Sequence, residues 1–249
     1  MMRAEFSEFQ YAYGCTRELE DGTSFINPLG IPFFPTQVEE ATRGYDVLFR
    51  GAVAPVFIQY KLAEYISNRR GKEWPYFRRP YFRFGIYPNS RSGQHNLLVD
   101  LSAEEPFVFY CAPTFIYRYS YLRAYIDRKI TLKSVFVPCK GLPYINDTER
   151  HYIVYSLNST KGYWCSEPQI INLIHGWENL AALYHKNENT FDKISRVILR
   201  LEQFFKINPE KDISIHKANE NNAIILRIKY IAAFSFVRYS LVLGLLVKR

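Results

Sequence analysis

Short runs of apolar and β-branched residues alternate along the first half of the chain with segments rich in glycine, proline and charge. Residues 44–49 and 56–61 are two such runs, separated by a tight loop. The second run is apolar except at Gln59 and Lys61. Runs of this kind, bounded by glycine and proline, are typical of strands buried on both faces. The pattern therefore predicts two neighbouring strands, with two polar side chains where a buried strand has few.

Other segments have the periodicity of helices. Phe6, Phe9 and Tyr13 recur at spacings of three and four, which predicts an amphipathic helix over residues 4–20. Residues 36–42 begin with a capping-box pattern, a threonine followed three residues later by a glutamate, which predicts a helical turn. The further predicted elements are a strand at 81–87, a helix at 91–101, a strand at 107–113, a helix from 114, an edge strand at 135–138 and a strand at 151–156.

The remainder of the chain is predicted to be mainly helical. Residues 161–168 are expected to form a loop that enters a helix, and residues 169–205 carry an apolar stripe at helical spacing. Residues 224–247 are strongly apolar but contain three basic residues. Because a charge in the middle of a membrane span costs several kcal/mol, we expect a buried helix over 221–238 and a strand at 241–247. Membrane association through this end is the weaker alternative.

Composition narrows the class of protein. The chain has 249 residues, of which 48% are hydrophobic and 17% aromatic, which favours one large domain or a compact core with a helical extension. The formal net charge of +8 is compatible with a nucleic-acid partner. The four cysteines are too far apart to suggest a metal site, and no apolar signal segment follows the N-terminus. These features predict reduced thiols and a cytoplasmic protein.

The two polar residues of the second strand indicate where a functional site lies. Gln59 and Lys61 are two positions apart, so they project from the same face of the strand. An amide and a cation on a buried strand are costly unless they bind something. Asp46, at the start of the partner strand, can lie across from them. The predicted result is a carboxylate, an amide and an ammonium group in a small volume.

This arrangement resembles the core of the PD-(D/E)XK nuclease superfamily, in the Gln-x-Lys variant of Mrr-like restriction endonucleases. The resemblance implies an α/β (α+β) fold with a restriction-endonuclease-like αβββαβ core, in which a central mixed sheet is flanked by helices. We place this core at residues 1–115 and expect 116–249 to be a mainly helical extension packed on it. Tyr45 stands where the name-giving proline would be, and Gln59 replaces the usual acid.

The resemblance also assigns roles to particular residues. Asp46 and Gln59, with Glu8 from the first helix, would hold Mg²⁺, with Mn²⁺ as a substitute. Hard oxygen ligands suit such ions, which lower the pKa of a bound water. Lys61 would activate that water or stabilise charge on the phosphate. In several branches of the superfamily a glutamine or basic residue on the second helix supports the site, and Gln94 and His95 hold roughly that place.

A charged segment after Lys61 is the best sequence candidate for a nucleic-acid contact. Arg69 and Arg70 lie there among aromatic residues, and such a mixture suits phosphates and bases. Simpler interpretations of these residues remain open. The segment is a surface loop, Glu8 and the pair Glu39 and Glu40 serve helix starts, and His95 is structural. In the same readings Asp46 caps a turn and Lys61 ends a strand.

Two functions follow from these patterns. The first is a metal-dependent endonuclease in restriction or anti-phage defence, with DNA favoured over RNA as its substrate and with a homo-oligomer or a partner defence protein left open. The second is a non-catalytic nucleic-acid-binding or scaffold protein that keeps the nuclease fold. Cleavage by the wild-type chain, lost in a Lys61→Ala variant that still binds nucleic acid, separates the two.

Overall fold

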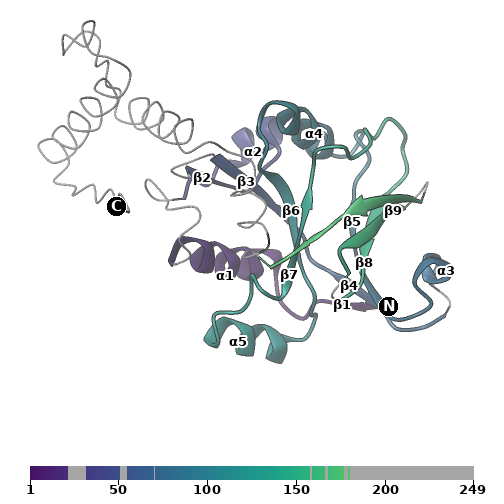
Figure 1. The fold of residues 1–249 in the computed structure, drawn as a ribbon. Helices are drawn as coiled ribbons and strands as arrows, with labels where there is room; N and C mark the ends of the chain where they lie inside the picture. Colours follow the sequence, from purple (N-terminus) through teal and green to yellow (C-terminus); the bar gives the residue numbers. More distant parts are fainter. Residues whose placement is uncertain are drawn as a thin grey trace, which may run out of the picture. The chain divides into compact units, whose positions relative to one another are not determined.

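The computed structural model describes residues 1–21, 32–50, 55–69, 71–157, 159–165, 168–176 and 179. The chain divides into two compact units. The first comprises Met1–Gly51 and Pro55–Lys186 and contains every described residue, and the second comprises Ala52–Ala54 and Asn187–Arg249. Figure 1 shows the described part as a mixed α/β structure with two sheets and a few helices. In this part of the chain, no helix is both long and apolar enough to cross a membrane.

The described residues form a five-stranded and a six-stranded sheet. The five-stranded sheet has the order β11 (Ile174–His175), β7 (Ser134–Pro138), β6 (Val108–Pro113), β3 (Pro55–Tyr60) and β2 (Val47–Arg50). The six-stranded sheet has the order β1 (Met2–Arg3), β4 (Glu64–Ile66), β5 (Tyr81–Ile86), β8 (His151–Tyr155), β9 (Lys161–Cys165) and β10 (Gln169–Asn172). The helices are α1 (Glu8–Asp21), α2 (Gln37–Arg43), α3 (Trp74–Phe77), α4 (Gln94–Glu104) and α5 (Arg118–Ile126).

The five-stranded sheet is mixed, as the sequence predicts. Strands β2 and β3 form an antiparallel pair in which Val47 lies opposite Ile58, so Asp46, just before β2, comes to lie beside Gln59. Strand β6 is parallel to β3, with Gln59 opposite Tyr110. The connection between β3 and β6 contains β4, β5 and α4. The chain therefore builds part of the six-stranded sheet before it completes the five-stranded one.

Different partners cover the two faces of β3. Tyr60 faces α1, where its hydroxyl lies 2.9 Å from that of Thr16. Gln59 faces the other way, toward α4. Figure 1 shows α1 and α4 on opposite sides of the strand. This double cover explains why β3 is apolar on both faces.

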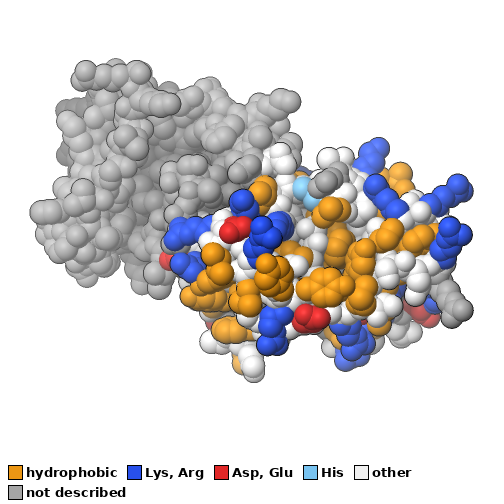
Figure 2. Space-filling model, turned by 90° about the horizontal axis from the view of Figure 1, so that it is seen from below, with side chains coloured by type: hydrophobic (Ala, Val, Ile, Leu, Met, Phe, Trp, Pro, Cys, Tyr) orange, Lys and Arg blue, Asp and Glu red, His pale blue; other side chains and the backbone are white. Residues whose placement is uncertain are grey.

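Helix α1 buries a different stripe from the one predicted. Tyr11, Cys15 and Leu19 are buried, at helical spacing, whereas Phe9 is 82% and Tyr13 55% exposed. The helix also begins later than expected, at Glu8, because Met2 and Arg3 pair with β4. Of the three aromatic residues that suggested the stripe, Phe6 is buried, but it precedes the helix. Figure 2 shows one face of the molecule, on which apolar and basic side chains are mixed.

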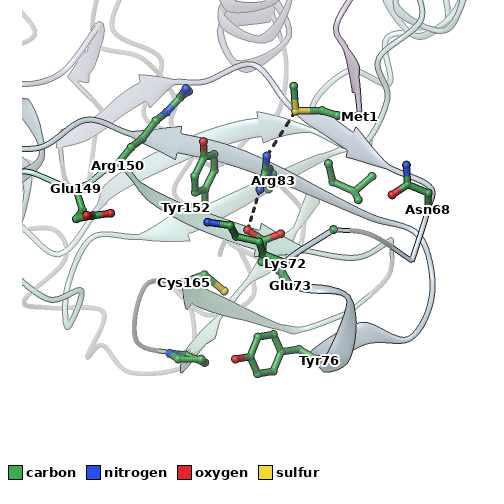
Figure 3. A pocket seen from close by; sticks show the side chains of 13 residues that line it. Met1, Asn68, Lys72, Glu73, Tyr76, Arg83, Glu149, Arg150, Tyr152 and Cys165 are labelled. Carbon is green, nitrogen blue, oxygen red and sulfur yellow. Dashed lines mark hydrogen bonds and ion pairs between the residues drawn. The ribbon is translucent and has the colours of Figure 1, made fainter.

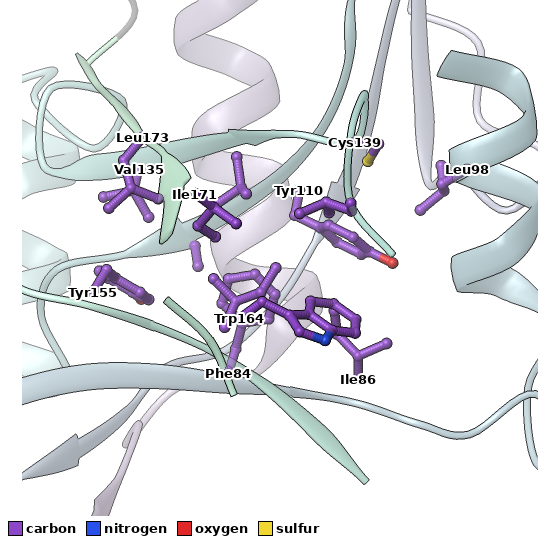
Figure 4. Packing of buried hydrophobic residues seen from close by; sticks show 14 of the residues in the cluster. Phe84, Ile86, Leu98, Tyr110, Val135, Cys139, Tyr155, Trp164, Ile171 and Leu173 are labelled. Carbon is purple, nitrogen blue, oxygen red and sulfur yellow. The ribbon is translucent and has the colours of Figure 1, made fainter. Parts of the chain in front are cut away.

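The core joins the two sheets. Phe84 and Tyr155 of the six-stranded sheet pack in one buried cluster with Tyr110 and Val135 of the five-stranded sheet and with Leu98 of α4 (Figure 4). The hydroxyl of Tyr155 donates to the carbonyl oxygen of Pro113 at 2.7 Å, which links β8 to β6 directly. Both sheets are therefore parts of one folded unit.

Helix α2 has the predicted capping box. Thr36 Oγ1 accepts from the backbone N–H of Glu39 at 3.3 Å, and the Glu39 carboxylate accepts from the backbone N–H of Thr36 at 2.9 Å. At the other end, Gly44 has a left-handed conformation (φ +82°). A Cβ at this position would press on the backbone oxygen of Gln94, at 2.9 Å. This glycine thus lets the chain before Asp46 approach the start of α4.

We expect Thr36→Ala to lower the free energy of unfolding by about 1 kcal/mol. Alanine has no hydroxyl oxygen to accept from the backbone N–H of Glu39, so one of the two reciprocal capping bonds is lost. Urea denaturation of the full chain measures the change. Thr42→Ala is a control on the same helix, because the Thr42 hydroxyl donates only to carbonyl oxygens within the helix. Equal stability of the two variants would contradict the role of the cap.

The strands predicted at 135–138 and 151–156 are present as β7 and β8, but the helix predicted from residue 169 is wrong, because residues 169–172 and 174–175 form β10 and β11. Strands β7 and β11 extend the five-stranded sheet and β8, β9 and β10 the six-stranded one. The proposed boundary at residue 115 therefore cuts through both sheets. Strand β7 is not an edge strand, because it pairs with β11 as well as β6. Residues 161–165 form β9 and not the predicted loop. The helix predicted at 221–238 and the strand predicted at 241–247 lie outside the described residues.

Candidate active site at the carboxyl end of strand β3

The predicted aspartate and glutamine are in direct contact. Asp46 Oδ2 accepts from Gln59 Nε2 at 2.8 Å and from the backbone N–H of Tyr60 at 2.7 Å. The backbone N–H of Asp46 donates to the Ile58 carbonyl oxygen, which continues the ladder of β2 and β3 by one bond. The antiparallel register therefore fixes the Asp46 carboxylate beside the end of β3.

Gln94, the first residue of α4, connects the other polar groups of the site. Its Oε1 accepts from Lys61 Nζ at 3.2 Å, and its Nε2 donates to Gln59 Oε1 at 2.8 Å and to Glu40 Oε1 at 3.2 Å. The Lys61 ammonium group and the Asp46 carboxylate are thus linked through two amide side chains. They lie on the same side of β3 and not on opposite sides of the sheet.

Three carboxyl groups surround this network. Burial raises the pKa of Asp46 to about 7, with Glu8 and Glu40 adding to the increase, while the Tyr60 N–H and the Lys61 ammonium oppose it. Desolvation also raises the pKa of Glu8, and Lys61 opposes this effect. A carboxyl group whose pKa is raised by neighbouring carboxyl groups lies where an added cation is electrostatically favourable.

A cleft of about 440 Å³ opens next to the network. Glu8 and Lys61 line it, and we call it the Glu8–Lys61 cleft. Two further cations, Arg3 and Arg150, also line it. The partly buried Lys61 therefore lies between the Asp46 network and a solvent-accessible space lined by three cations and by the carboxyl groups of Glu8 and Glu64.

The geometry changes the predicted metal ligands. The Gln59 amide presents its nitrogen to Asp46, and its oxygen accepts from Gln94, so Gln59 holds the carboxylate in place and is not a ligand in this arrangement. Among the described residues, no three His, Cys, Asp or Glu side chains are grouped closely enough to form a metal cage. Of the predicted ligands, Asp46 and Glu8 are the two that carry carboxyl groups, and Glu8 adds to the raised pKa of Asp46. Two suffice for Mg²⁺, which usually keeps several waters and uses substrate phosphate as a ligand.

His95 does not belong to the site. Its Nε2 donates to the Pro143 carbonyl oxygen at 2.8 Å, so its Nδ1 accepts from the Tyr110 hydroxyl at 2.9 Å. Burial lowers its pKa to about 4. Both ring nitrogens are occupied inside the core, and the histidine is neutral near pH 7. The predicted substrate contact at His95 is therefore corrected to a structural role.

The predicted basic contacts are also rearranged. Arg69 lies in an exposed turn after β4 and is not among the residues of the Glu8–Lys61 cleft. Arg70 lies outside the described residues. Sequence reasoning missed Arg3 and Arg150, since neither belongs to a basic or aromatic run. From the sequence, Glu40 is either an extra ligand or part of a solvated capping surface, and the structure places its carboxylate against Gln94.

Comparison of the chain with protein-family models, with curated proteins and with solved structures gave no match. The geometry of the described residues is therefore the basis for a functional proposal.

Proposed function

We propose that the chain is a metal-dependent nuclease of the PD-(D/E)XK kind, which hydrolyses phosphodiester bonds in DNA. The observation that carries the proposal is the linked set of Asp46, Gln59, Gln94 and Lys61 at the end of one strand. Glu8 lies at the mouth of the same site. A buried carboxyl group with a raised pKa, one ammonium group and an adjoining basic cleft suit a reaction at a phosphate.

The element order gives further support. Helix α1, the β2–β3 hairpin, β5, α4 and the parallel strand β6 follow one another as the resemblance implies. The correspondence departs at β5, which pairs in the six-stranded sheet rather than beside β3. The site residues nevertheless come from the elements on which the resemblance places them. Glu8 begins α1, Asp46 precedes β2, Lys61 follows β3 and Gln94 begins α4.

Each residue has a separate task in the proposed reaction. A divalent cation, when bound by Asp46 and Glu8, would supply charge stabilisation and lower the pKa of a water. Gln59 and the Tyr60 N–H orient the Asp46 carboxylate through Oδ2. Lys61 places an ammonium group at the wall of the cleft, where it stabilises negative charge that develops on the phosphate. Gln94 holds that ammonium group in position.

A specific observation favours the alternative of a non-catalytic nucleic-acid-binding protein. Gln59 turns its nitrogen to Asp46, and its oxygen accepts from Gln94, so the amide adds no ligand to the carboxyl groups of Asp46 and Glu8. A plasmid-nicking assay distinguishes the two functions. The wild-type chain is incubated with supercoiled DNA and Mg²⁺, Mn²⁺ or a chelator, and a structured RNA is tested in parallel. Metal-dependent nicking supports the nuclease. DNA binding without cleavage under any of these conditions supports the alternative.

A role in restriction or anti-phage defence is part of the proposal, because an unregulated nuclease harms its own cell.

We expect Gln94→Leu to lower kcat about tenfold or more with little change in KM, because the lysine ammonium loses its acceptor while the cleft stays open. Steady-state cleavage of a labelled duplex measures both constants. A rise in KM with unchanged kcat would instead assign Gln94 to substrate binding. Asn96→Leu is a control on the same helix turn, because among the described residues the Asn96 side chain bonds to the backbone of Ile145 and to no group of the site.

A further inference from the structure

Guanidinium groups and tyrosine rings alternate across the open face of the six-stranded sheet. The Arg83 guanidinium carbon lies 4.1 Å from the centre of the Tyr152 ring, and that of Arg150 lies 5.2 Å from the same ring. Arg150 also lies 5.0 Å from the Tyr87 ring, which is 4.1 Å from Arg91. We call these five residues the arginine–tyrosine row. Figure 3 shows the Arg150, Tyr152 and Arg83 part of it.

The row connects two clefts. Tyr87 and Arg150, next to Arg91 at one end of the row, line the Glu8–Lys61 cleft, whereas Arg91 itself lies outside it. At the other end, Arg150, Tyr152 and Arg83 line a second cleft of about 600 Å³, into which Lys72 also projects (Figure 3). Arg150 belongs to both clefts. A chain-like ligand can therefore extend from one to the other along the row.

Two of the three arginines keep their donors free for a ligand. Arg83 is neutralised, because its Nε donates to Glu64 at 3.0 Å and its Nη1 to Glu73 at 2.8 Å. Arg91 and Arg150 are exposed and form no ion pair with a described residue; tyrosine rings hold them instead. A ring contact orients a guanidinium group without using its N–H donors. Such groups suit the bidentate binding of a phosphate.

Gly85 determines where Arg150 lies. Strand alternation puts Arg83 and Gly85 on one face of β5, opposite the buried Phe84, and Tyr87 follows directly after the strand. A Cβ at position 85 would overlap the Arg150 guanidinium group, so the missing side chain provides the space that this group occupies. The Arg150 position is thus built into the sheet.

We propose that the arginine–tyrosine row binds the phosphodiester backbone of a nucleic-acid strand that leads into the Glu8–Lys61 cleft. The proposal deepens the nuclease function and rests on it for the identity of the strand as substrate. Arg150 and Arg91 contact phosphates, Tyr87 and Tyr152 keep the arginines extended, and Arg83 anchors the far end of the row. Glu149 also lines the second cleft, and its negative charge disfavours a phosphate beside it. The phosphates of the nucleic-acid strand are therefore expected beside Arg150.

Binding of a fluorescein-labelled DNA duplex, measured by anisotropy over a range of salt concentrations without metal, tests the row separately from cleavage. We expect Arg150→Ala and Arg91→Ala each to weaken binding about threefold to tenfold and to reduce the slope of log K against log salt by about 1. Gly85→Ala should have a similar effect with no charge removed, because its methyl group displaces the Arg150 guanidinium. Arg123→Ala, an exposed arginine of α5, is the charge-matched control and should bind like the wild type.

Wild-type binding by both Arg150→Ala and Arg91→Ala would overturn the row, and so would equal weakening by Arg123→Ala. These outcomes leave the nuclease proposal intact if the wild-type chain still nicks DNA. Conversely, the expected loss of affinity in a chain that never cleaves DNA would support the row as a nucleic-acid-binding surface and overturn only its role in catalysis. Circular dichroism of Gly85→Ala verifies that the strand is preserved, and Arg150→Ala gives the same test with the glycine intact.

Discussion

Replacing Lys61 with alanine is expected to slow metal-dependent cleavage of plasmid DNA about 100- to 1000-fold. The ammonium group lies between the carboxylate network and the open cleft, and Gln94 fixes it there at 3.2 Å. It is therefore placed to stabilise charge on a phosphate in the cleft. The duplex should still bind to the variant, with a loss no larger than one phosphate contact gives. Nicking rates and anisotropy on the same preparations measure the two effects.

Lys129→Ala provides the matched control, because this lysine is exposed and follows α5. It should cleave at the wild-type rate. Lys61→Arg is a second test, since arginine retains the positive charge of lysine but changes the shape of the hydrogen-bond donor. Unchanged cleavage by Lys61→Ala would remove the lysine from the mechanism. An equal loss of cleavage and binding would indicate that Lys61 only attracts DNA.

Replacing Asp46 with asparagine is expected to abolish cleavage and at the same time to stabilise the fold. The carboxyl group has a pKa of about 7 in the folded chain, raised mainly by burial, against an ordinary value near 3.8. Between these pH values the folded chain binds a proton that the unfolded chain has released. The free energy of unfolding therefore falls as pH rises through this window. Above pH 7 the stability lost by ionising the buried Asp46 has reached its full value.

The asparagine variant avoids this penalty. Relative to wild type, its free energy of unfolding should rise by about 1 kcal/mol per pH unit from near pH 4 to pH 7, and the gain should level off above, at about 2 to 4 kcal/mol. Urea denaturation at several pH values measures it, with the exposed Asp127→Asn as control. A variant that is less stable than wild type at every pH would show that Asp46 is a structural residue, as the capping interpretation of the sequence holds.

The candidate site was largely predictable because its residues lie on short, regular elements. Strand alternation puts Gln59 and Lys61 on one face, and the hairpin register brings Asp46 beside them. The sequence could not reveal the orientation of the Gln59 amide or that Gln94 connects the network. These features depend on how closely α4 approaches the site. The left-handed conformation of Gly44 permits this approach, but a glycine in the sequence does not by itself reveal its conformation.

The second half of the chain was less predictable for a physical reason. Residues 169–175 are short strands that pair with β9 and β7, and apolar residues over so few positions fit a helix equally well. Their conformation is decided by partners distant in the sequence. The basic contacts were missed likewise, because Arg150 comes close to Gly85 only through the pairing of β8 with β5.

The interleaving of the two sheets has a consequence for synthesis on the ribosome. Strand β3 is synthesised early. The buried cluster to which its Phe57 belongs also needs Tyr155 of β8, which is synthesised about ninety residues later. The nascent chain must therefore carry an unfinished apolar surface until both sheets can close together. We therefore expect neither half to fold as an autonomous fragment, and we expect a chaperone that shields this surface during translation to raise the yield of native protein.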